Sequence, residues 1–248
     1  MPTTSPSAPL DPATGVRRLA AVREAIAKSC QQNGRDPGSV SLLAVSKTFP
    51  IEAVDVIAAA GQRAFGENYA QEGVEKATAR PELEWHFIGP IQSNKTRGIA
   101  EHFAWVHSID RLKIAQRLSE QRPATLPPMQ VCVQVNIADE ATKSGCTPKD
   151  ALALCQAIAA LPQLQLRGLM AIPEATSDQA TQRRHFAALR QLRDAINAAD
   201  STLKLDTLSM GMSDDLASAI VEGSTIVRIG SAIFGPRTYT NTSDSLEQ

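Results

Sequence analysis

The segment that decides the fold covers residues 208–237 and reads LSMGMSDDLASAIVEGSTIVRIGSAIFGPR. It contains, in order, a glycine-containing loop, a short amphipathic helix pattern, an apolar strand with a single arginine, and a second loop of small residues. A helical pattern followed by a short apolar run is typical of one unit of a parallel sheet. The two loops also predict a cup for an anionic group, because small residues let backbone N–H groups approach phosphate oxygens.

The same alternation of strand and helix extends upstream from this segment. A helical pattern over residues 15–33 comes first, and roughly eight strand–helix units with short connections follow it. The expected strands are 40–46, 63–65, 84–87, 105–107, 129–136, 164–169, 205–208 and 225–229. This number of units predicts an α/β fold in which the sheet closes into a single (β/α)8 barrel. An open doubly wound sheet would want a GxGxxG turn after its first strand, and the sequence has none.

The composition of the 248 residues is that of an ordinary globular protein. The 25 basic and 26 acidic side chains nearly balance, and no run of one sign suggests a nucleic-acid partner. An aromatic content of 4% also argues against base-stacking platforms. The four cysteines and four histidines show neither CxxC spacing nor clustering, so we expect no metal site and no disulfide framework.

We expect a simple organisation along the chain. A disordered leader over 1–13 precedes one barrel domain over 14–238, which carries an extra N-terminal helix, and a flexible tail covers 239–248. The leader lacks a charged segment followed by an apolar core, so it is no secretory signal. No apolar run approaches the roughly 18 residues of a membrane span. These observations favour a cytoplasmic protein with no membrane partner.

Two cations are candidates for a ligand site at the carboxyl ends of the strands, where barrels of this kind carry their sites. Lys47 ends the first apolar run and shares a face with Leu43 and Val45. Partial burial would leave its amine neutral enough to attack an aldehyde, whereas a solvent-exposed lysine at the barrel mouth is the alternative. Arg228 shares a face with Ile226, and a guanidinium inside the barrel needs an acceptor, either a carboxylate or a bound ligand.

The loops after the seventh and eighth strands predict phosphate contacts. The first contains Ser209, Met210 and Gly211, and the second contains Gly230 and Ser231. Phosphate groups often sit at these two loops of a barrel, although ordinary turn glycines would give the same pattern. A strand-end lysine facing such a cup could hold an aldehyde-bearing phosphate ester covalently.

The other polar residues near strand ends are weaker candidates. Asn68 and His86 could contact a ligand, but a helix cap and a core histidine are the alternatives. Lys143, in the loop DEATKSG, is either a second amine at the site or a solvated lysine. The pair Asp214 and Asp215 is explained by its position at a helix start.

At these residues the chain resembles the pyridoxal 5′-phosphate (PLP) homeostasis proteins, the YggS/PROSC family of PLP-binding proteins. The resemblance covers residues 42–237 and rests on LLAVSKTFP, FGENYAQE, WHFIGPIQSNKTR, VHSIDR, VQVNIADEATKSG, LRGLMAIP and the segment quoted first. It implies a barrel like the N-terminal domain of alanine racemase (PLP fold type III), without the β domain of that enzyme. Lys47 matches the Schiff-base lysine of the family, and Arg228 matches the arginine that faces the pyridine nitrogen.

Two positions depart from the family pattern. Ser231 stands where many relatives have threonine, which keeps the hydroxyl, and Phe49 stands where some relatives carry a second lysine. The predicted cofactor-binding residues are Lys47, Asn68, His86, Ser209, Met210, Gly211, Arg228, Gly230 and Ser231, with no catalytic residue and no metal ligand.

The resemblance implies a protein that binds the vitamin B6 cofactor PLP and stores, protects or delivers it without turnover. An arginine at the pyridine nitrogen weakens the electron sink, and racemisation needs a second acid–base group, for which the only tyrosines are Tyr69 and Tyr239. A PLP-dependent racemase or lyase of fold type III, an aldolase-like Schiff-base enzyme and a bare scaffold are the alternatives. PLP-dependent apo-enzymes are candidate partners, and we expect a monomer because the chain lacks the domain that makes the racemase dimer.

Overall fold

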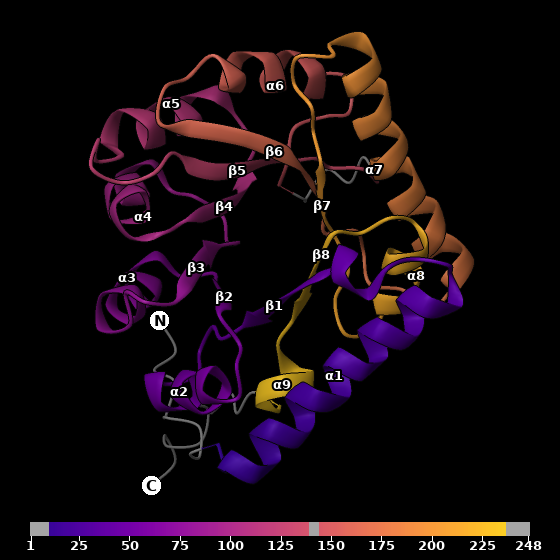
Figure 1. Cartoon of the computed structure of the whole chain (residues 1–248). Helices are drawn as coiled ribbons and strands as arrows, with labels where there is room; N and C mark the ends of the chain where they lie inside the picture. Colours follow the sequence, from indigo (N-terminus) through magenta and orange to yellow (C-terminus); the bar gives the residue numbers. More distant parts are fainter. Residues whose placement is uncertain (1–9, 139–143, 237–248) are drawn as a thin grey trace, which may run out of the picture.

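The structure, a computed structural model, describes residues 10–138 and 144–236. Within these residues, eight parallel strands close into a barrel whose spatial order is the chain order (Figure 1). Their bounds are β1 Ser41–Val45, β2 Ala64–Glu67, β3 Glu84–Phe87, β4 Trp105–Ile109, β5 Met129–Gln134, β6 Leu164–Met170, β7 Thr207–Ser209 and β8 Ile226–Ile229. The predicted (β/α)8 barrel is confirmed.

Helices connect successive strands and form an outer layer around the barrel (Figure 1). Following β1 to β8 in turn, they are α2 Ile51–Ala59, α3 Ala70–Ala79, α4 Thr96–His102, α5 Leu112–Gln121, α6 Ala151–Ala159, α7 Gln179–Ala199, α8 Leu216–Val221 and α9 Ser231–Phe234. Short 3-10 turns, Pro37–Ser39 and Ser93–Lys95, precede β1 and α4. Helices α2 to α8 lie where the periodicity predicts helices, with ends that differ by a few residues. Helix α9 begins at Ser231, where the sequence shows only a short apolar segment.

The extra N-terminal helix, α1 Pro12–Gln32, begins earlier than predicted. The Asp11 carboxylate accepts a hydrogen bond from the Thr14 N–H at 2.9 Å, and Pro12 occupies the first helical position. Leu10 packs against the core. Residues 10–13, which we expected in the disordered leader, are therefore ordered. The helix packs on α2, α8 and α9, where the first and last units of the barrel meet.

The side chains of the strands form two separate apolar layers. Leu43, Val45, Ile88 and Ile226 form a small cluster inside the barrel, and the larger core lies between the strands and the helices. Val227, like Ile229, belongs to the outer core. The face that Ile226 shares with Arg228 is therefore the inner one, as strand alternation requires.

Two glycines are required where backbones approach closely. A Cβ on Gly89 would lie 2.1 Å from the carbonyl oxygen of Asn68, and a Cβ on Gly168 would lie 1.8 Å from that of Thr207. Neither position can accept a side chain without moving backbone. Gly89 thus sets the spacing between the loops that follow β2 and β3, at the carboxyl-terminal mouth of the barrel.

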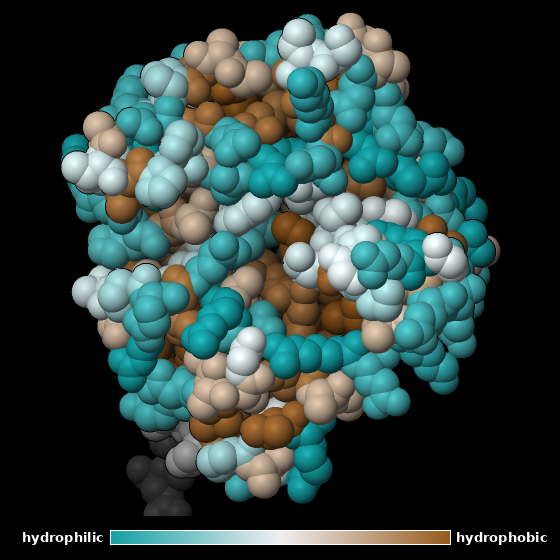
Figure 2. Space-filling model, in the orientation of Figure 1, coloured by the Kyte–Doolittle hydropathy of each residue, from teal (hydrophilic) through white to brown (hydrophobic). Residues whose placement is uncertain are grey.

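The surface seen in Figure 2 is mainly hydrophilic and is hollowed near its centre, where apolar side chains are visible. In the described part of the chain, no helix is both long enough and apolar enough to cross a membrane.

Candidate functional site

Lys47 lies in the turn that directly follows β1 and is partly buried. Leu43 and Val45 point into the barrel, so continued alternation predicts the same side for Lys47. The strand beside β1 is β8, and Leu43 pairs with Arg228 in the register of these two strands. The two cations that the sequence singled out therefore belong to neighbouring parts of the barrel, with Arg228 in β8 and Lys47 just after the adjacent strand β1.

Arg228 is 4% exposed and makes two hydrogen bonds near the carboxyl-terminal end of the barrel. One terminal nitrogen donates to the Ser209 hydroxyl oxygen at 2.8 Å, and the other donates to the Ala171 carbonyl oxygen at 3.0 Å. Among the described residues, no carboxylate lies within ion-pair distance of the guanidinium, so the internal ion pair considered as an alternative is not found there. Burial lowers the pKa of Arg228 to about 10, which still leaves it charged at neutral pH.

Ser209 is the start of a hydrogen-bonded chain that runs back through the barrel interior. Its hydroxyl lies 2.7 Å from Nδ1 of His107, and Nε2 of His107 lies 2.9 Å from Nδ1 of His86. Nε2 of His86 lies 2.7 Å from the Glu84 carboxylate. Glu84 begins β3, so the chain connects the amino-terminal end of the barrel with Arg228.

The two ends of this chain fix the position of every proton in it. Burial lowers the pKa of both His86 and His107, so both rings are neutral at pH 7, and the hydrogen bond from His86 keeps the pKa of Glu84 low. An ionised carboxylate only accepts, so His86 carries its proton on Nε2 and accepts at Nδ1 from Nε2–H of His107. His107 then accepts from the Ser209 hydroxyl, whose oxygen accepts from Arg228.

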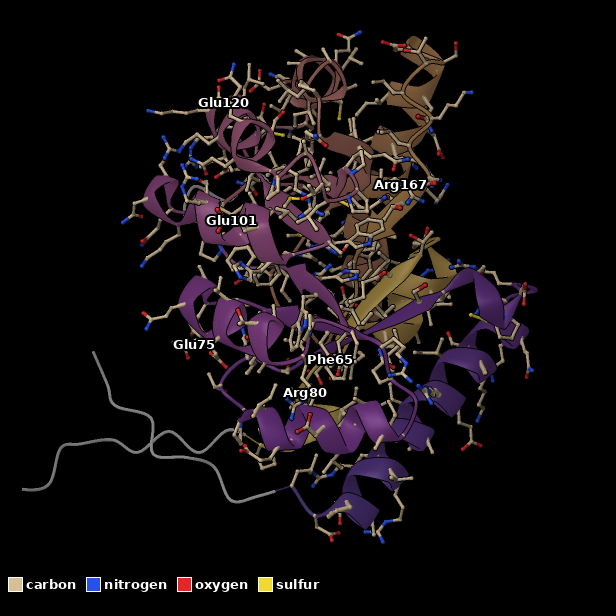
Figure 3. All side chains as sticks on the ribbon, turned by 60° about the vertical axis from the view of Figure 1, so that its left-hand side comes forward. Phe65, Glu75, Arg80, Glu101, Glu120 and Arg167 are labelled. Atoms are coloured by element: carbon tan, nitrogen blue, oxygen red, sulfur yellow. The ribbon has the colours of Figure 1, made fainter. Side chains whose placement is uncertain are left out.

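Aromatic and charged groups support the buried end of the chain. The Trp105 ring stacks on His86 with centroids 5.3 Å apart, and the Arg167 guanidinium lies 5.3 Å from the centroid of Trp105. Arg167, labelled in Figure 3, is held from the other side by the Asp206 carboxylate at 2.6 Å. These contacts fix the His86 ring and keep the chain in one arrangement.

The loop after β7 is shaped by Gly211 and Asp215. Gly211 has a φ of 98°, and a Cβ there would lie 2.5 Å from the Cβ of Ala219. The Asp215 carboxylate accepts from the Met212 N–H at 2.6 Å, and the Gly211 carbonyl accepts from the Arg228 N–H at 2.9 Å. The loop is therefore held against β8 by backbone and side-chain hydrogen bonds.

The loop after β8 is short and leads directly into α9. The Gly230 carbonyl accepts from the N–H groups of Ile233 and Phe234, each at 2.9 Å. Ser231 is exposed at the first position of the helix, where N–H groups have no acceptor within the helix. These features suit an anionic ligand group, as the sequence predicts for Gly230 and Ser231.

Asn68 follows β2 at the barrel mouth and has an unusual amide. Its Oδ1 is buried and has no hydrogen-bond partner among residues 10–138 and 144–236. The helix-cap alternative does not apply, because Tyr69 is the N-cap of α3 and no side chain caps that helix. A buried polar atom without a partner is rare in folded proteins, and at a mouth of this kind it suits a ligand with a donor.

The predicted residues fall into two groups in the structure. Lys47, Asn68, Gly230 and Ser231 lie at the carboxyl ends of β1, β2 and β8, and Met210 and Gly211 lie at that of β7. The side chains of His86 and Ser209 instead point into the barrel as members of the hydrogen-bonded chain. Two residues weighed earlier, Lys143 and Tyr239, lie outside the described residues.

Sequence reasoning missed the two residues that complete this chain, His107 and Glu84. His107 is one position of a strand pattern, WVHSI, whose alternation could have placed it on the inner face. The bond between His107 and His86 joins the neighbouring strands β3 and β4. His86 pairs with Trp105 in their register, and His107 lies two residues further along β4 on the same face, so two inward histidines on neighbouring strands were the available signal. Among the described residues, no group of three or more His, Cys, Asp or Glu side chains could hold a metal ion.

Comparison with known proteins defines the class of this barrel. The family described as "Alanine racemase, N-terminal domain" matches residues 18–238. The alanine racemase of Corynebacterium glutamicum superposes with a TM-score of 0.69 at 16% identity, over 92% of this chain and 62% of that one. That likeness shows the fold, which is the barrel of the alanine racemase N-terminal domain.

Relatives with higher identity define the family within that class. The pyridoxal phosphate homeostasis protein of Pseudomonas aeruginosa is 60% identical over 228 residues, which cover 91% of this chain and 97% of that protein. PipY of Synechococcus elongatus, solved with PLP bound, superposes with a TM-score of 0.77 at 36% identity, over 89% of this chain and 100% of that one. The chain belongs to the pyridoxal phosphate homeostasis protein family.

Proposed function

We propose that this protein binds PLP at the carboxyl-terminal mouth of its barrel and holds it in store for delivery, without catalytic turnover. The observation that carries the proposal is Arg228, a buried guanidinium that faces the barrel interior with no carboxylate within ion-pair distance among the described residues. Two of its N–H groups have protein acceptors, and a guanidinium has five. A ligand atom with a free lone pair, such as a pyridine nitrogen, suits the remaining donors.

The residues present fit the other parts of the cofactor. When bound, PLP supplies an aldehyde that condenses with a lysine amine to a Schiff base with loss of water. Lys47 is the amine that we assign to this bond, since it follows the strand adjacent to that of Arg228. The loops at Met210–Gly211 and Gly230–Ser231 would hold the phosphate, and the unpartnered Oδ1 of Asn68 would accept from the cofactor.

The absence of turnover is proposed from the state of Arg228. Its pKa is lowered to about 10 by burial, so at neutral pH it can only donate. A pyridine nitrogen that accepts from it stays unprotonated and stabilises a neighbouring carbanion poorly. Racemisation also needs a second acid–base group. Tyr69 is 55% exposed after β2, and the position of Tyr239 is not described.

The test of a carrier against an enzyme uses the PLP-loaded protein. Incubation with L-alanine or D-alanine, followed by chiral chromatography, is expected to show no more racemisation than free PLP at the same concentration. Turnover that is lost in Lys47→Ala would contradict the carrier role and support the racemase.

Arg228→Met is expected to weaken PLP binding roughly 10- to 100-fold by equilibrium dialysis, because a charge-assisted hydrogen bond contributes about 1.5–3 kcal/mol. Unchanged affinity would contradict the role of Arg228.

We also propose that the protein acts in the cytoplasm as a monomer and passes PLP to apo-enzymes. The family to which the chain belongs supports a role in cofactor supply. Sedimentation of the purified protein is expected to give one species near 26.5 kDa, and a concentration-independent dimer would contradict the monomer.

A further inference from the structure

A buried group of charges lies directly behind the turn that carries Lys47. The Lys76 ammonium, on α3, lies 2.7 Å from Glu67 and 2.6 Å from Glu72. The side chains of Lys76 and Glu67 are 7% and 0% exposed, and that of Glu72 is 27% exposed. We call these three residues the buried triad. Glu67 is the last residue of β2, so the triad lies between the barrel wall and α3.

The triad holds the chain on both sides of Lys47. The Lys76 ammonium donates to the Ser46 carbonyl oxygen at 2.8 Å, and the Ser46 hydroxyl donates to Glu67 at 2.7 Å. On the other side of Lys47, the Thr48 N–H donates to Glu72 at 2.7 Å. The residues immediately before and after Lys47 are thus fixed by one connected set of charges.

The conformation of the turn shows that this fixation acts against a backbone preference. Thr48 has a φ of 68°, in the left-handed region that β-branched residues avoid. Such a conformation is unfavourable for a residue with a branched Cβ and persists where surrounding structure imposes it. The hydrogen bond from the Thr48 N–H to Glu72 is a contact that imposes it here.

General stability does not account for the triad. Replacing a buried ion pair by apolar side chains of similar volume is often neutral or stabilising, because desolvation offsets the attraction between the charges. Glu67 also keeps one buried oxygen, Oε2, without a hydrogen-bond partner among the described residues. A buried set of charges that is incompletely satisfied, and that contacts the backbone on both sides of Lys47, points to a role in placing the turn.

We infer that Lys76 is a positioning residue for Lys47, acting with Glu67 and Glu72. The triad holds residues 46–48 in the conformation from which the Lys47 amine reaches the carbonyl carbon of the aldehyde. Positioning of this kind lowers the free energy of covalent attachment and leaves contacts to the phosphate and ring unchanged. The inference rests on the proposed function, because it concerns the lysine assigned to PLP.

Two ligands separate the covalent step from the rest of binding. PLP and pyridoxine 5′-phosphate share the ring and the phosphate, but the second has a hydroxymethyl group where PLP has its aldehyde. The ratio of their dissociation constants, Kd for pyridoxine 5′-phosphate over Kd for PLP, therefore measures the contribution of Lys47 alone. Fluorescence or calorimetric titration of the full chain gives both constants, and the visible spectrum reports the covalent complex.

Lys76→Met keeps the apolar stem and removes the charge, and is expected to lower this ratio on the order of tenfold. Lys113→Met, an exposed lysine of α5, is the matched control and should leave the ratio unchanged. Glu72→Ala removes the acceptor for Thr48 and should lower the ratio by several-fold. Glu72→Gln keeps an acceptor oxygen there and should restore most of it.

The outcomes distinguish this inference from the proposed function. Wild-type protein that binds both ligands equally, or binds neither, would contradict covalent attachment itself. A wild-type preference for PLP that Lys76→Met and Glu72→Ala both retain would contradict the positioning role alone. Should Lys76→Met fail to fold, the comparison of Glu72→Ala with Glu72→Gln decides. An equal fall of the Kd ratio in these two variants would also count against the positioning role.

Discussion

Replacing Ser209 by alanine should destabilise the protein more than any ordinary buried serine. Its hydroxyl is fully buried and joins two groups, accepting from Arg228 at 2.8 Å and lying 2.7 Å from Nδ1 of His107. The alanine would leave a charged N–H and an imidazole nitrogen unsatisfied inside the barrel. Neither can turn to water, because Arg228 is 4% exposed and His107 is fully buried.

The expected magnitude follows from the two lost hydrogen bonds. A bond to a charged donor contributes about 1.5–3 kcal/mol and a neutral one about 0.5–1.5 kcal/mol, which together give about 2–4 kcal/mol. For a chain of this size each kcal/mol lowers Tm by about 2–4 °C, so we expect a fall of roughly 4–16 °C.

Urea unfolding and thermal melts of the protein without ligand test this value. Ser224→Ala is the matched control, since Ser224 is equally buried but its hydroxyl donates to a backbone carbonyl, that of Met210, at 2.7 Å. The control should lose about 1 kcal/mol. Equal losses of unfolding free energy in the two variants would refute the account of the hydrogen-bonded chain from Glu84 to Arg228. Nitrogen NMR spectra that place the proton of His107 on Nδ1 would refute it as well.

Two further predictions concern Glu67 and Gly89. Burial raises the pKa of Glu67 from 4.5 to about 7, so its contribution to stability is full below about pH 4.5 and is lost as pH rises through 7. Between about pH 5 and 8, the free energy of unfolding of Glu67→Gln should therefore fall by about 2–3 kcal/mol less than that of the wild type, as measured by urea unfolding. Parallel pH profiles of the two proteins would contradict this. Gly89→Ala would place a Cβ 2.1 Å from the Asn68 carbonyl oxygen, and it should lower the free energy of unfolding by about 3 kcal/mol or more. Gly98→Ala, in α4, meets one side-chain atom at 3.1 Å and should be near neutral, so similar melting temperatures for the two variants would count against the close approach.

The fold could be predicted because each strand and helix keeps its own periodicity. The pattern EWHF predicts a strand with the observed bounds of β3. Strand alternation predicts that Ile226 and Arg228 share a face, but only the structure shows that this face is the inner one. The predicted start of α1 at residue 15 is wrong, because α1 begins at Pro12, inside the predicted leader. The Asp11 cap and the proline behind it are instead a helix-start signal.

The site could be predicted only in part, since strand ends are visible in the sequence and contacts between strands are not. The sequence places Lys47 and Arg228 at the mouth, but it does not show that Ser209 turns inward to His107, 102 residues away. Nor does it show that Lys76, nine residues after Glu67, turns back to the carbonyl of Ser46. These contacts depend on barrel closure and on the packing of α3, which local patterns do not specify.

The visible absorption spectrum of the protein with PLP, before and after borohydride reduction, tests cofactor binding most directly. We expect a visible band that reduction removes, with one pyridoxyl group per chain found on Lys47 by peptide mass spectrometry. Lys47→Ala should give no reducible band and no labelled peptide. A protein that stays colourless with added PLP, or a stoichiometric label on another lysine, would contradict the assignment of Lys47 and of the barrel mouth as the PLP site.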